Sequence, residues 1–344
     1  MVNVSIIIPC RNEEKFIGKC LDSIIAQDYP NDKLEVLVVD GKSGDRTRDI
    51  VEDYTKCFSF VKLVDNLKKV APIAFNIGIK RAKGKIIVIM SAHAVYPPSY
   101  ISTCLKYLDK TSADVVGGPV ITMPGADSLF AKGIALATSH PFGVGNSMFR
   151  ISTKEGYVDT VPFGAYKREV FEKIGLFNEQ LVRNQDNELN NRITNSGRKI
   201  YLTPKLTSYY YNQSTLSGLL KQALKTGMWN VVTIKINPAA FRWRHFIPFL
   251  FITALMVSVF LTLVHPSMQP IFFVLVGLYV CAALLSSIQI GIREGMNFIL
   301  ILPVLFFLYH VCYGIGTWAG LLRMVFTSWQ GGSNNGKTKE GIPA

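Results

Sequence analysis

The chain lacks the cysteine patterns that mark metal-binding or redox motifs. Its six cysteines are scattered over 344 residues and form neither a Cys-x-x-Cys pair nor a zinc-ligand spacing. We therefore interpret them as reduced packing residues. Internal repeats are also absent, and low-complexity sequence is confined to a polar tail, so residues 327–344 are expected to be disordered.

Charged residues are scarce in the last hundred positions. Only four of the 37 basic residues and two of the 24 acidic residues follow Arg244, so the preceding part of the chain carries +11 of the net charge of +13. That part has no basic stripe interleaved with aromatic residues, which argues against a nucleic-acid partner. The basic excess suits an anionic membrane surface or a phosphate-bearing substrate better.

Three uncharged runs fill the charge-poor region, at residues 246–264, 271–290 and 298–322. Each has roughly the 20 residues that cross a hydrocarbon core. We predict a transmembrane region at residues 245–326, with about three spans.

The orientation of these spans follows from flanking charge. Basic residues cluster before the first run, and the positive-inside rule then places the N-terminal domain in the cytoplasm. We expect a multi-pass protein of the cell inner membrane or plasma membrane, in contact with membrane lipid. Basic residues in the tail oppose an outside location, so a last run that is re-entrant or broken at Gly314, Gly316 and Gly320 is the alternative.

The first part of the chain alternates between β-branched runs and amphipathic segments. We expect strands at 4–8, 34–39, 61–64 and 86–90, and helices at 16–25, 46–54 and 71–82. This alternation predicts an α/β fold with a mostly parallel sheet flanked by helices. Ligands of such sheets bind beyond the carboxyl ends of the strands, which here are residues 9–13, 40–45 and 91–93.

The pattern is less regular after residue 114. We expect strands at 115–120, 158–163 and 200–202, helices at 127–137, 167–174 and 189–196, and a tight glycine-dependent loop at 141–146. Residues 214–244 contain a helix with apolar residues on one side and lysines on the other. This pattern predicts an amphipathic membrane-interface segment, with a helix packed on the preceding domain as the alternative.

Five stretches together resemble family-2 glycosyltransferases with the GT-A fold. They are residues 4–14 (VSIIIPCRNEE), 38–47 (VVDGKSGDRT), 91–94 (SAHA), 160–168 (TVPFGAYKR) and 183–186 (RNQD). Within that family the chain is most similar to membrane-anchored exopolysaccharide glycosyltransferases of the succinoglycan type. The resemblance implies that residues 1–213 form a GT-A catalytic domain. It also implies an inverting hexosyltransferase that moves a sugar from a nucleotide-diphosphate donor, expected to be UDP-linked, to a polyprenyl-linked saccharide.

The nucleotide site is expected at the first two strand ends. A carboxylate such as Asp40 can accept hydrogen bonds from a uracil ring NH or a ribose hydroxyl, and the resemblance assigns Asp40 to the nucleotide. The resemblance also assigns the turn at residues 9–13 to the nucleotide. The full expected nucleotide-binding set is Pro9, Arg11, Glu13, Asp40, Asn76 and Ser91. A turn or helix-cap role is the alternative for Asp40.

The third strand end departs from the family pattern. Relatives usually carry Asp-x-Asp there, and its second carboxylate binds a divalent metal that bridges the sugar diphosphate; this chain has Ser91-Ala92-His93. His93 is the expected metal ligand, and an imidazole suits Mn²⁺ better than Mg²⁺. Direct hydrogen bonding of His93 to the diphosphate is the alternative. Because Ser91 carries no charge, the requirement for a metal stays open.

Asp186 occupies the position of the family's catalytic base, which deprotonates the acceptor hydroxyl. The neutral Gln185 beside it avoids a like charge that would raise its pKa strongly. Glu188 is a weaker candidate that could orient Arg192. From the residues alone, acids favoured in a first helical turn by the helix dipole are the competing interpretation.

Acceptor contacts are expected from Gly164, Ala165 and Gln185, although a packing role explains the glycine equally well. The Gln-x-x-Arg-Trp motif of processive synthases does not occur, which predicts transfer of a single sugar. Two alternatives are transfer to polyprenyl phosphate itself, as in dolichyl-phosphate sugar synthases, and a degenerate transferase kept as a membrane scaffold. The donor sugar, the linkage and the oligomeric state are not indicated.

Overall fold

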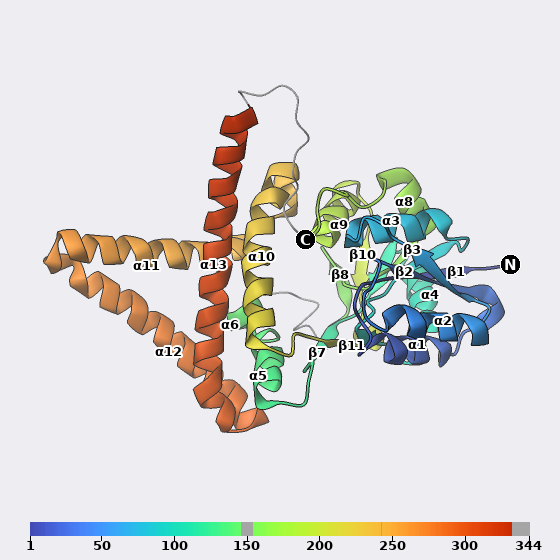
Figure 1. Ribbon diagram of the computed structural model, residues 1–344, viewed down its shortest axis with the longest axis horizontal. Helices are drawn as coiled ribbons and strands as arrows, with labels where there is room; N and C mark the ends of the chain where they lie inside the picture. The colour runs from blue at the N-terminus through green and yellow to red at the C-terminus, as the bar shows by residue number, and fades with distance from the viewer. Residues whose placement is uncertain (146–153, 242, 332–344) are drawn as a thin grey trace. The chain divides into compact units, whose positions relative to one another are not determined.

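A computed structural model describes residues 1–145, 154–241 and 243–331. These residues divide into two compact units (Figure 1). The first contains residues 1–121 and 154–211 of the described chain, and the second contains the remainder.

A mixed sheet of eight strands forms the centre of the first unit, in the order β3-β2-β1-β4-β9-β6-β10-β8. The strands are β1 Val4–Cys10, β2 Leu34–Asp40, β3 Val61–Asp65, β4 Ile86–Ile89, β6 Val115–Gly117, β8 Gly156–Val158, β9 Ala165–Lys167 and β10 Ile200–Leu202. Strand β1 is parallel to β2 and β4, and β2 is parallel to β3. Strand β9 runs antiparallel between β4 and β6, and β8 is antiparallel to β10. The predicted α/β fold with a mostly parallel sheet is confirmed.

Helices cover both faces of this sheet. They are α1 Ile17–Ile25, α2 Thr47–Cys57, α3 Ala71–Arg81, α4 Tyr100–Lys110, α8 Arg168–Ile174 and α9 Gln185–Asn195, with short 3-10 turns η1 Asn31–Lys33 and η2 Pro204–Leu206. Successive side chains of a strand point to opposite faces. Ile6 and Ile8 accordingly belong to the core shared with α1 and α4, and Ile7 belongs to the core shared with α3 and α9. Burial on both faces explains why β1 is apolar almost throughout.

A second, three-stranded sheet has the order β5-β11-β7, with β5 Ala94–Val95, β11 Ser208–Tyr211 and β7 Val120–Met123. Strand β11 is antiparallel to β5. The backbone N–H of Tyr211 donates to the carbonyl of His93 at 2.9 Å. This bond ties β11 to the turn after β4.

Three stretches differ from the sequence-based expectation. The strand expected at 115–120 is divided between β6 and β7, which belong to different sheets. The strand expected at 158–163 is replaced by β8 and β9, because Phe163 adopts a left-handed φ of 48° that turns the chain between them. The loop expected at 141–146 begins as a helical turn, α6 Pro141–Val144, and Gly145 follows at φ 70°. Residue 146 lies outside the described residues.

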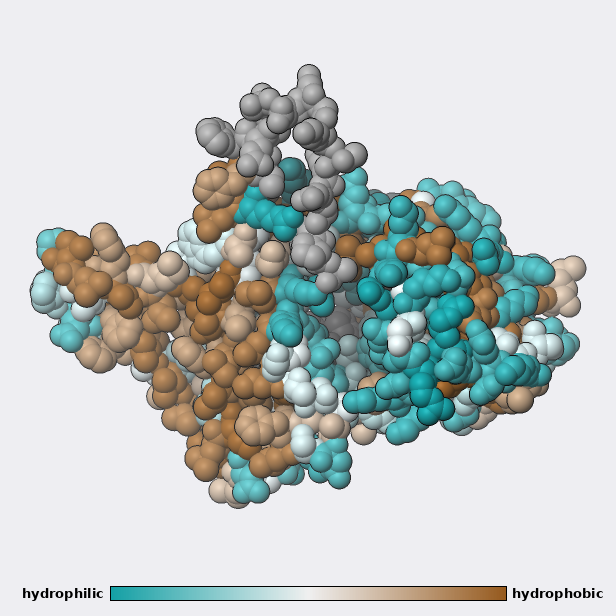
Figure 2. All heavy atoms as spheres, viewed as in Figure 1, coloured by the Kyte–Doolittle hydropathy of each residue, from teal (hydrophilic) through white to brown (hydrophobic). Residues whose placement is uncertain are grey.

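The second unit is predominantly helical. It contains α5 Leu129–Ala137, α6, α10 Leu216–Ile236, α11 Ile247–Val264, α12 Gln269–Glu294 and α13 Asn297–Gly331, with short turns η3 Pro238–Ala240, η4 Trp243–Phe246 and η5 Pro266–Met268. Three of its helices, α11, α12 and α13, are long and apolar enough to cross a membrane. Figure 2 shows hydrophobic side chains gathered over these helices.

The last apolar run is one continuous helix, so the alternative of a break at its glycines is wrong. Those glycines allow α10 to approach α13 closely. A Cβ at Gly316 would overlap the carbonyl of Leu224, and a Cβ at Gly227 would overlap the carbonyl of Tyr313. The buried side of α10 therefore lies against α13, within the second unit.

Helices α5 and α6 also belong to the second unit, although a single catalytic domain was expected over residues 1–213. The reason is apolar packing. Ile134 and Ala137 of α5 share a buried cluster with Leu219 of α10 and with Leu302 and Phe306 of α13. Residues 122–145 therefore belong to the second unit, although the segments on either side of them in the sequence belong to the first.

The close contact between α10 and α13, called here the α10–α13 seam, can be tested by adding one methyl group to it. Gly316→Ala should lower the unfolding free energy by about 1–3 kcal/mol, because the new methyl overlaps the α10 backbone. Gly277→Ala in α12 is the matched control, since a Cβ there meets nothing within 4 Å and alanine favours helix. Thermal unfolding in detergent, followed by circular dichroism, measures both. An equal midpoint for the two variants would contradict a close seam.

Candidate active site

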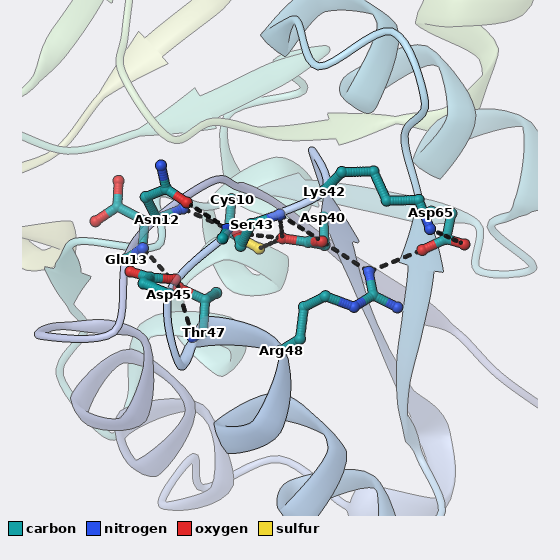
Figure 3. Close-up of polar contacts among 11 residues, drawn as sticks. Cys10, Asn12, Glu13, Asp40, Lys42, Ser43, Asp45, Thr47, Arg48 and Asp65 are labelled. Atoms are coloured by element: carbon teal, nitrogen blue, oxygen red, sulfur yellow. Dashed lines mark hydrogen bonds and ion pairs between the residues drawn. The ribbon is translucent and has the colours of Figure 1, made fainter.

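The turns that follow β1 and β2 hold each other in place (Figure 3). The backbone N–H of Asn12 donates to Ser43 Oγ at 2.9 Å, and the N–H of Gly44 donates to Asn12 Oδ1 at 2.9 Å. The N–H of Glu13 donates to Thr47 Oγ1 at 2.7 Å. These reciprocal bonds fix the geometry of both strand ends without any ligand.

Asp40 lies at the centre of this arrangement and is fully buried. Its carboxylate accepts from the Ser43 N–H at 3.1 Å and from the Ser43 hydroxyl at 2.5 Å. Arg48 Nη1 donates to it at 2.7 Å, and the Cys10 thiol lies 3.7 Å away. Asp40 was expected to contact the nucleotide. That contact stays a prediction, and the bonds described here also fit the alternative, a residue that organises the turn.

Arg48 extends the network to the next strand. Asp40 and Asp65 are register partners at the ends of β2 and β3. Arg48 Nη1 also donates to Asp65 Oδ1 at 2.8 Å, while Lys42 Nζ donates to Asp65 Oδ2 at 2.8 Å (Figure 3). Sequence reasoning missed Arg48 and Asp65, although both adjoin strand ends that the ligand rule singles out.

His93 pairs with Glu13. The distance from His93 Nδ1 to Glu13 Oε1 is 2.8 Å, and the ring of Tyr210 meets His93 edge-on with centroids 4.8 Å apart. Ser91 is used by its own turn, because its N–H donates to the Tyr96 hydroxyl and its Oγ accepts from the His93 N–H. The structure therefore joins the first and third strand ends through a carboxylate and an imidazole.

The donor set at His93 fits a metal that is shared with a substrate. Within residues 1–145, 154–241 and 243–331, no group of three or more His, Cys, Asp or Glu side chains could hold a metal by itself. A metal-binding histidine commonly donates its other ring nitrogen to a carboxylate that fixes its orientation. Glu13 stands in that relation to His93, and substrate phosphates can supply the remaining oxygen ligands.

Asp186 and Glu188 share one helical turn but differ in environment. Asp186 is exposed, and the Asn187 N–H donates to its Oδ1 at 2.9 Å. Nearby protein atoms disfavour the charged form of Asp186 and raise its pKa, whereas the hydrogen bond from Asn187 and the water that reaches the exposed carboxylate oppose this shift. Glu188 is buried and accepts two bonds from Arg192, at 2.8 and 2.9 Å.

Arg192 has a further role as a clamp. It donates to the carbonyls of Ile174 and Leu176, both at 2.7 Å. The predicted orientation of Arg192 by Glu188 thus serves to fix the turn between α8 and α9. Of the two acids, only Asp186 has a carboxylate that is open to solvent.

Several expected site residues are used by the fold instead. Asn76 is buried in α3, where both amide hydrogens are engaged by Phe177 O and Glu179 Oε1, so the structure does not support a nucleotide contact. Ala165 is fully buried in β9 between β4 and β6. A Cβ at Gly164 would crowd the Tyr166 ring, so the packing explanation of the glycine holds.

The remaining residues expected to contact a substrate are at least partly exposed or have a polar atom without a partner. Arg11 is exposed beside Gly41, and Pro9 is half-buried at the end of β1. Gln185 Oε1 is buried and has no hydrogen-bond partner in the described part of the chain. A buried acceptor without a donor is costly, so this oxygen is free to take a hydrogen bond from water or substrate.

Comparisons with known proteins identify the class. The model described as Glycosyl transferase family 2 matches residues 5–175. A dolichyl N-acetyl-alpha-D-glucosaminyl phosphate 3-beta-D-2,3-diacetamido-2,3-dideoxy-beta-D-glucuronosyltransferase of Methanococcus voltae is 30% identical over 329 residues, which are 93% of this chain and 97% of that protein. Succinoglycan biosynthesis protein ExoA of Rhizobium meliloti (strain 1021) is 26% identical over 254 residues, covering 69% and 76% of the two chains.

The fold agrees with this class. Mannosyltransferase PcManGT from Pyrobaculum calidifontis, solved with GDP-Man and Mn²⁺, superposes with a TM-score of 0.55 at 20% identity over 90% of this chain and 86% of that one. The sheet is thus of the GT-A type. The chain belongs to glycosyl transferase family 2, and it is an enzyme of the glycosyltransferase class.

The anchoring role of Asp40 can be separated from ligand binding. Asp40→Asn should lower the unfolding free energy by about 2 kcal/mol, because it removes the buried partner of Arg48 while Asp65 still holds that guanidinium. Asp53→Asn is the matched control, because Asp53 forms an exposed pair with Lys56. Chemical denaturation in detergent, without nucleotide, measures both. Equal stability of the two variants would refute an anchoring role.

Proposed function

We propose that the protein transfers a single sugar, with inversion, from a nucleotide-diphosphate sugar to a lipid-linked saccharide, and that Asp186 is the general base. The observation that carries this proposal is the contrast within the first turn of α9. Asp186 is exposed and free of ion pairs among the described residues, while Glu188 is buried and locked to Arg192. Only one carboxylate of this turn can accept a proton from a substrate.

In the proposed step, Asp186 removes the proton from an acceptor hydroxyl. The hydroxyl oxygen forms a bond to the anomeric carbon as the bond from that carbon to the donor diphosphate breaks, and a nucleoside diphosphate leaves. The exposed carboxylate of Asp186 can meet an acceptor hydroxyl directly, and this access, rather than a raised pKa, favours its role as the base.

The leaving diphosphate needs positive charge beside it. His93, oriented by Glu13, is the residue that would hold a divalent metal together with the diphosphate oxygens. When bound there, the metal would neutralise charge that develops on the leaving group, and an imidazole ligand favours Mn²⁺ over Mg²⁺. Arg11, exposed at the end of β1, would add a cationic contact to the nucleotide.

The acceptor is proposed from the relatives and from the second unit. The Methanococcus voltae relative acts, by its name, on a dolichyl-linked sugar phosphate, and ExoA serves succinoglycan biosynthesis. Three helices that could cross a membrane would keep the enzyme beside such a lipid. We place the catalytic unit on the cytoplasmic face, since basic residues precede α11. A lipid that already carries a sugar is favoured over bare polyprenyl phosphate, because the M. voltae acceptor carries one.

The base is tested by Asp186→Asn. Transfer should fall by at least about 100-fold, because the amide cannot take the proton, while donor binding and folding are retained. Release of free nucleoside diphosphate in detergent, with a lipid-linked saccharide and with bare polyprenyl phosphate as acceptors, measures the rate and separates the two acceptor classes. Glu188→Gln is the matched control. It weakens the buried pair with Arg192, so it should lower stability rather than the transfer rate of the folded protein. Unchanged turnover of Asp186→Asn would show that Asp186 is not the general base.

The metal site is tested through Glu13. Glu13→Gln should raise the Mn²⁺ concentration for half-maximal transfer by about 10- to 100-fold, because the imidazole loses the carboxylate that orients it. Glu169→Gln, in an exposed pair with Lys173 on α8, should leave the Mn²⁺ requirement unchanged. Full activity of the unaltered enzyme after chelation would exclude a metal role for His93.

A further inference from the structure

Helix α13 has an exposed apolar face along most of its length. The large hydrophobic side chains on this face, called here the α13 stripe, are Leu300, Val304, Phe307, Ile315, Leu322 and Val325. Successive members are three, four, seven or eight positions apart, which places them on one side of an α-helix. A contiguous exposed apolar face of this kind marks an interaction surface.

The other side of α13 is buried against protein. Leu302 shares an apolar cluster with Leu219 of α10 and Ile134 of α5. A Cβ at Gly320 would lie 2.9 Å from the carbonyl oxygen of Met228 in α10. Leu302 and Gly320 each stand two positions from a member of the α13 stripe, which turns them about 200° away from it. The all-round apolar composition of α13 therefore has two causes, a packed side and an exposed side.

Two lysines lie on the side of α10 that is turned away from α13. Lys225 is two positions before Gly227, whose Cβ would overlap the carbonyl of Tyr313. Lys221 is one turn earlier on the same side of α10 and is exposed. Both lysines therefore stand beside the middle of the uncharged run at residues 298–322.

These charges do not fit an α13 that crosses a bilayer. If it did, Lys221 and Lys225 would lie near the midplane, where a charged side chain is strongly unfavourable. Helix α5, which packs on the first turns of α13, adds the exposed ion pair of Lys132 with Asp127. Charge thus accompanies α13 along its length on one side, whereas the charges that flank a spanning helix lie at its two ends.

Helix α11 leads away from α13 instead of running beside it. Its first turns contact α13, because Trp318 Nε1 donates to Thr253 Oγ1 at 3.1 Å and a Cβ at Gly314 would meet the Ile252 side chain. Its later residues, 256–264, are mostly exposed. Figure 1 shows α11 crosswise to α13, on the side that does not carry α10. Spanning helices tilt on average about 20° from the bilayer normal, so a crosswise pair does not fit two spans.

Helices α11 and α12 have the properties of a spanning pair. They contain 18 and 26 residues, which extend about 27 and 39 Å at 1.5 Å per residue, against a hydrocarbon core of about 30 Å. In the most apolar stretch of each, 11% of the residues are buried, compared with 39% in α13. Exposed apolar surface on every side is what contact with lipid requires. The turn η5 between them carries no charged residue that would oppose crossing.

We propose that α11 and α12 form a membrane-spanning hairpin and that α13 lies in the membrane interface, with the α13 stripe in the acyl-chain boundary and α10 on the water side. Two spans return the chain to the side from which it entered. The catalytic unit and the residues that follow α13 therefore share one face of the membrane. Arg323 and the lysines at the end of the sequence are then on the cytoplasmic side, which the positive-inside rule favours. This seating does not depend on which donor or acceptor the enzyme uses.

Lipid fits the α13 stripe better than a protein partner does, because the stripe continues the surface of the hairpin. The ring of Phe307 meets the ring of Tyr279 in α12 with centroids 6.0 Å apart. The neighbours of that tyrosine, Leu278 and Val280, are exposed. Figure 2 shows the hydrophobic side chains of these helices as one continuous area. A protein that covered the stripe alone would have to end where the lipid around the hairpin begins.

The test measures the depth of single nitroxide labels by electron paramagnetic resonance, with oxygen and a nickel chelate as relaxing agents. The full chain is reconstituted in vesicles of phosphatidylcholine and phosphatidylglycerol. Three cysteines that are not buried are first replaced by serine; they are Cys57, Cys281 and Cys312. Labels are then attached to the exposed face of α13 in the variants Leu300→Cys, Ile315→Cys and Leu322→Cys.

The three α13 labels should lie at equal depth, about 5–10 Å within the boundary between headgroups and acyl chains. Residues 300–322 extend about 33 Å along the helix. A spanning α13 would therefore place label 315 far deeper than labels 300 and 322, and that gradient would overturn the proposed seating. Labels shielded from both relaxing agents would show that protein covers the stripe, which would overturn lipid as its partner.

Helix α12 supplies the matched control in the same background. The variants Leu278→Cys, Leu285→Cys and Ile292→Cys carry labels on one exposed face, at 67%, 67% and 74% exposure in the unaltered chain. These labels should become shallower in that order, by about 20 Å in total, because a spanning α12 returns to the level of α13. Equal depths along α12 would refute the hairpin. If circular dichroism shows that an α13 label disturbs folding, Val304→Cys replaces it on the same stripe.

Reporter fusions to the end of the full chain test the sidedness. Two spans predict that a green fluorescent protein fusion is fluorescent and that an alkaline phosphatase fusion is inactive in a bacterial host, because both reporters remain in the cytoplasm. An active phosphatase with a dark fluorescent protein would show an odd number of spans and overturn the proposed seating. Failure of the transferase function is distinguishable, since a protein that releases no nucleoside diphosphate would keep the same label depths and reporter signals.

Discussion

The site depends on one buried charge, the carboxylate of Asp40. A charge without solvent is costly unless donors surround it, and here Ser43 and Arg48 supply them. Meeting that requirement forces the turn after β2 to fold back on its own strand end. The turn after β1 then bonds to it through Asn12, and β3 is joined through Arg48 and Asp65. Three strand ends are thus held in one geometry before any substrate binds.

Local sequence patterns predicted the first half of the fold well, because each buried parallel strand is a short apolar run followed by a polar turn. They predicted the strand ends that carry Glu13, Asp40 and His93 for the same reason. They gave no sign of the buried position of Ala165, since insertion of antiparallel β9 between β4 and β6 is a long-range pairing with no local signature. Asn76 shows the same limit, because its partners Phe177 and Glu179 lie about a hundred positions away.

The glycines of α13 show how one residue type supports opposite predictions. In isolation Gly314, Gly316 and Gly320 weaken a helix, and they were the positions at which the alternative of a broken run placed its break. Against α10 they remove side chains where two backbones approach, as small residues do between helices in a membrane. Packing along the helix outweighs the unfavourable propensity. The partner helix decides the outcome, and it lies some ninety positions earlier in the chain.

The triplet Ser91-Ala92-His93 contains no carboxylate, whereas the family resemblance implies one at this position. Glu13 reaches His93 from the end of β1, so one carboxylate and one imidazole still face the same place. The backbone of Glu13 is held by its N–H, which donates to Thr47 Oγ1 at 2.7 Å. Metal affinity at this site would then depend on the orientation of one histidine and on substrate phosphates, since charge on the triplet itself is absent.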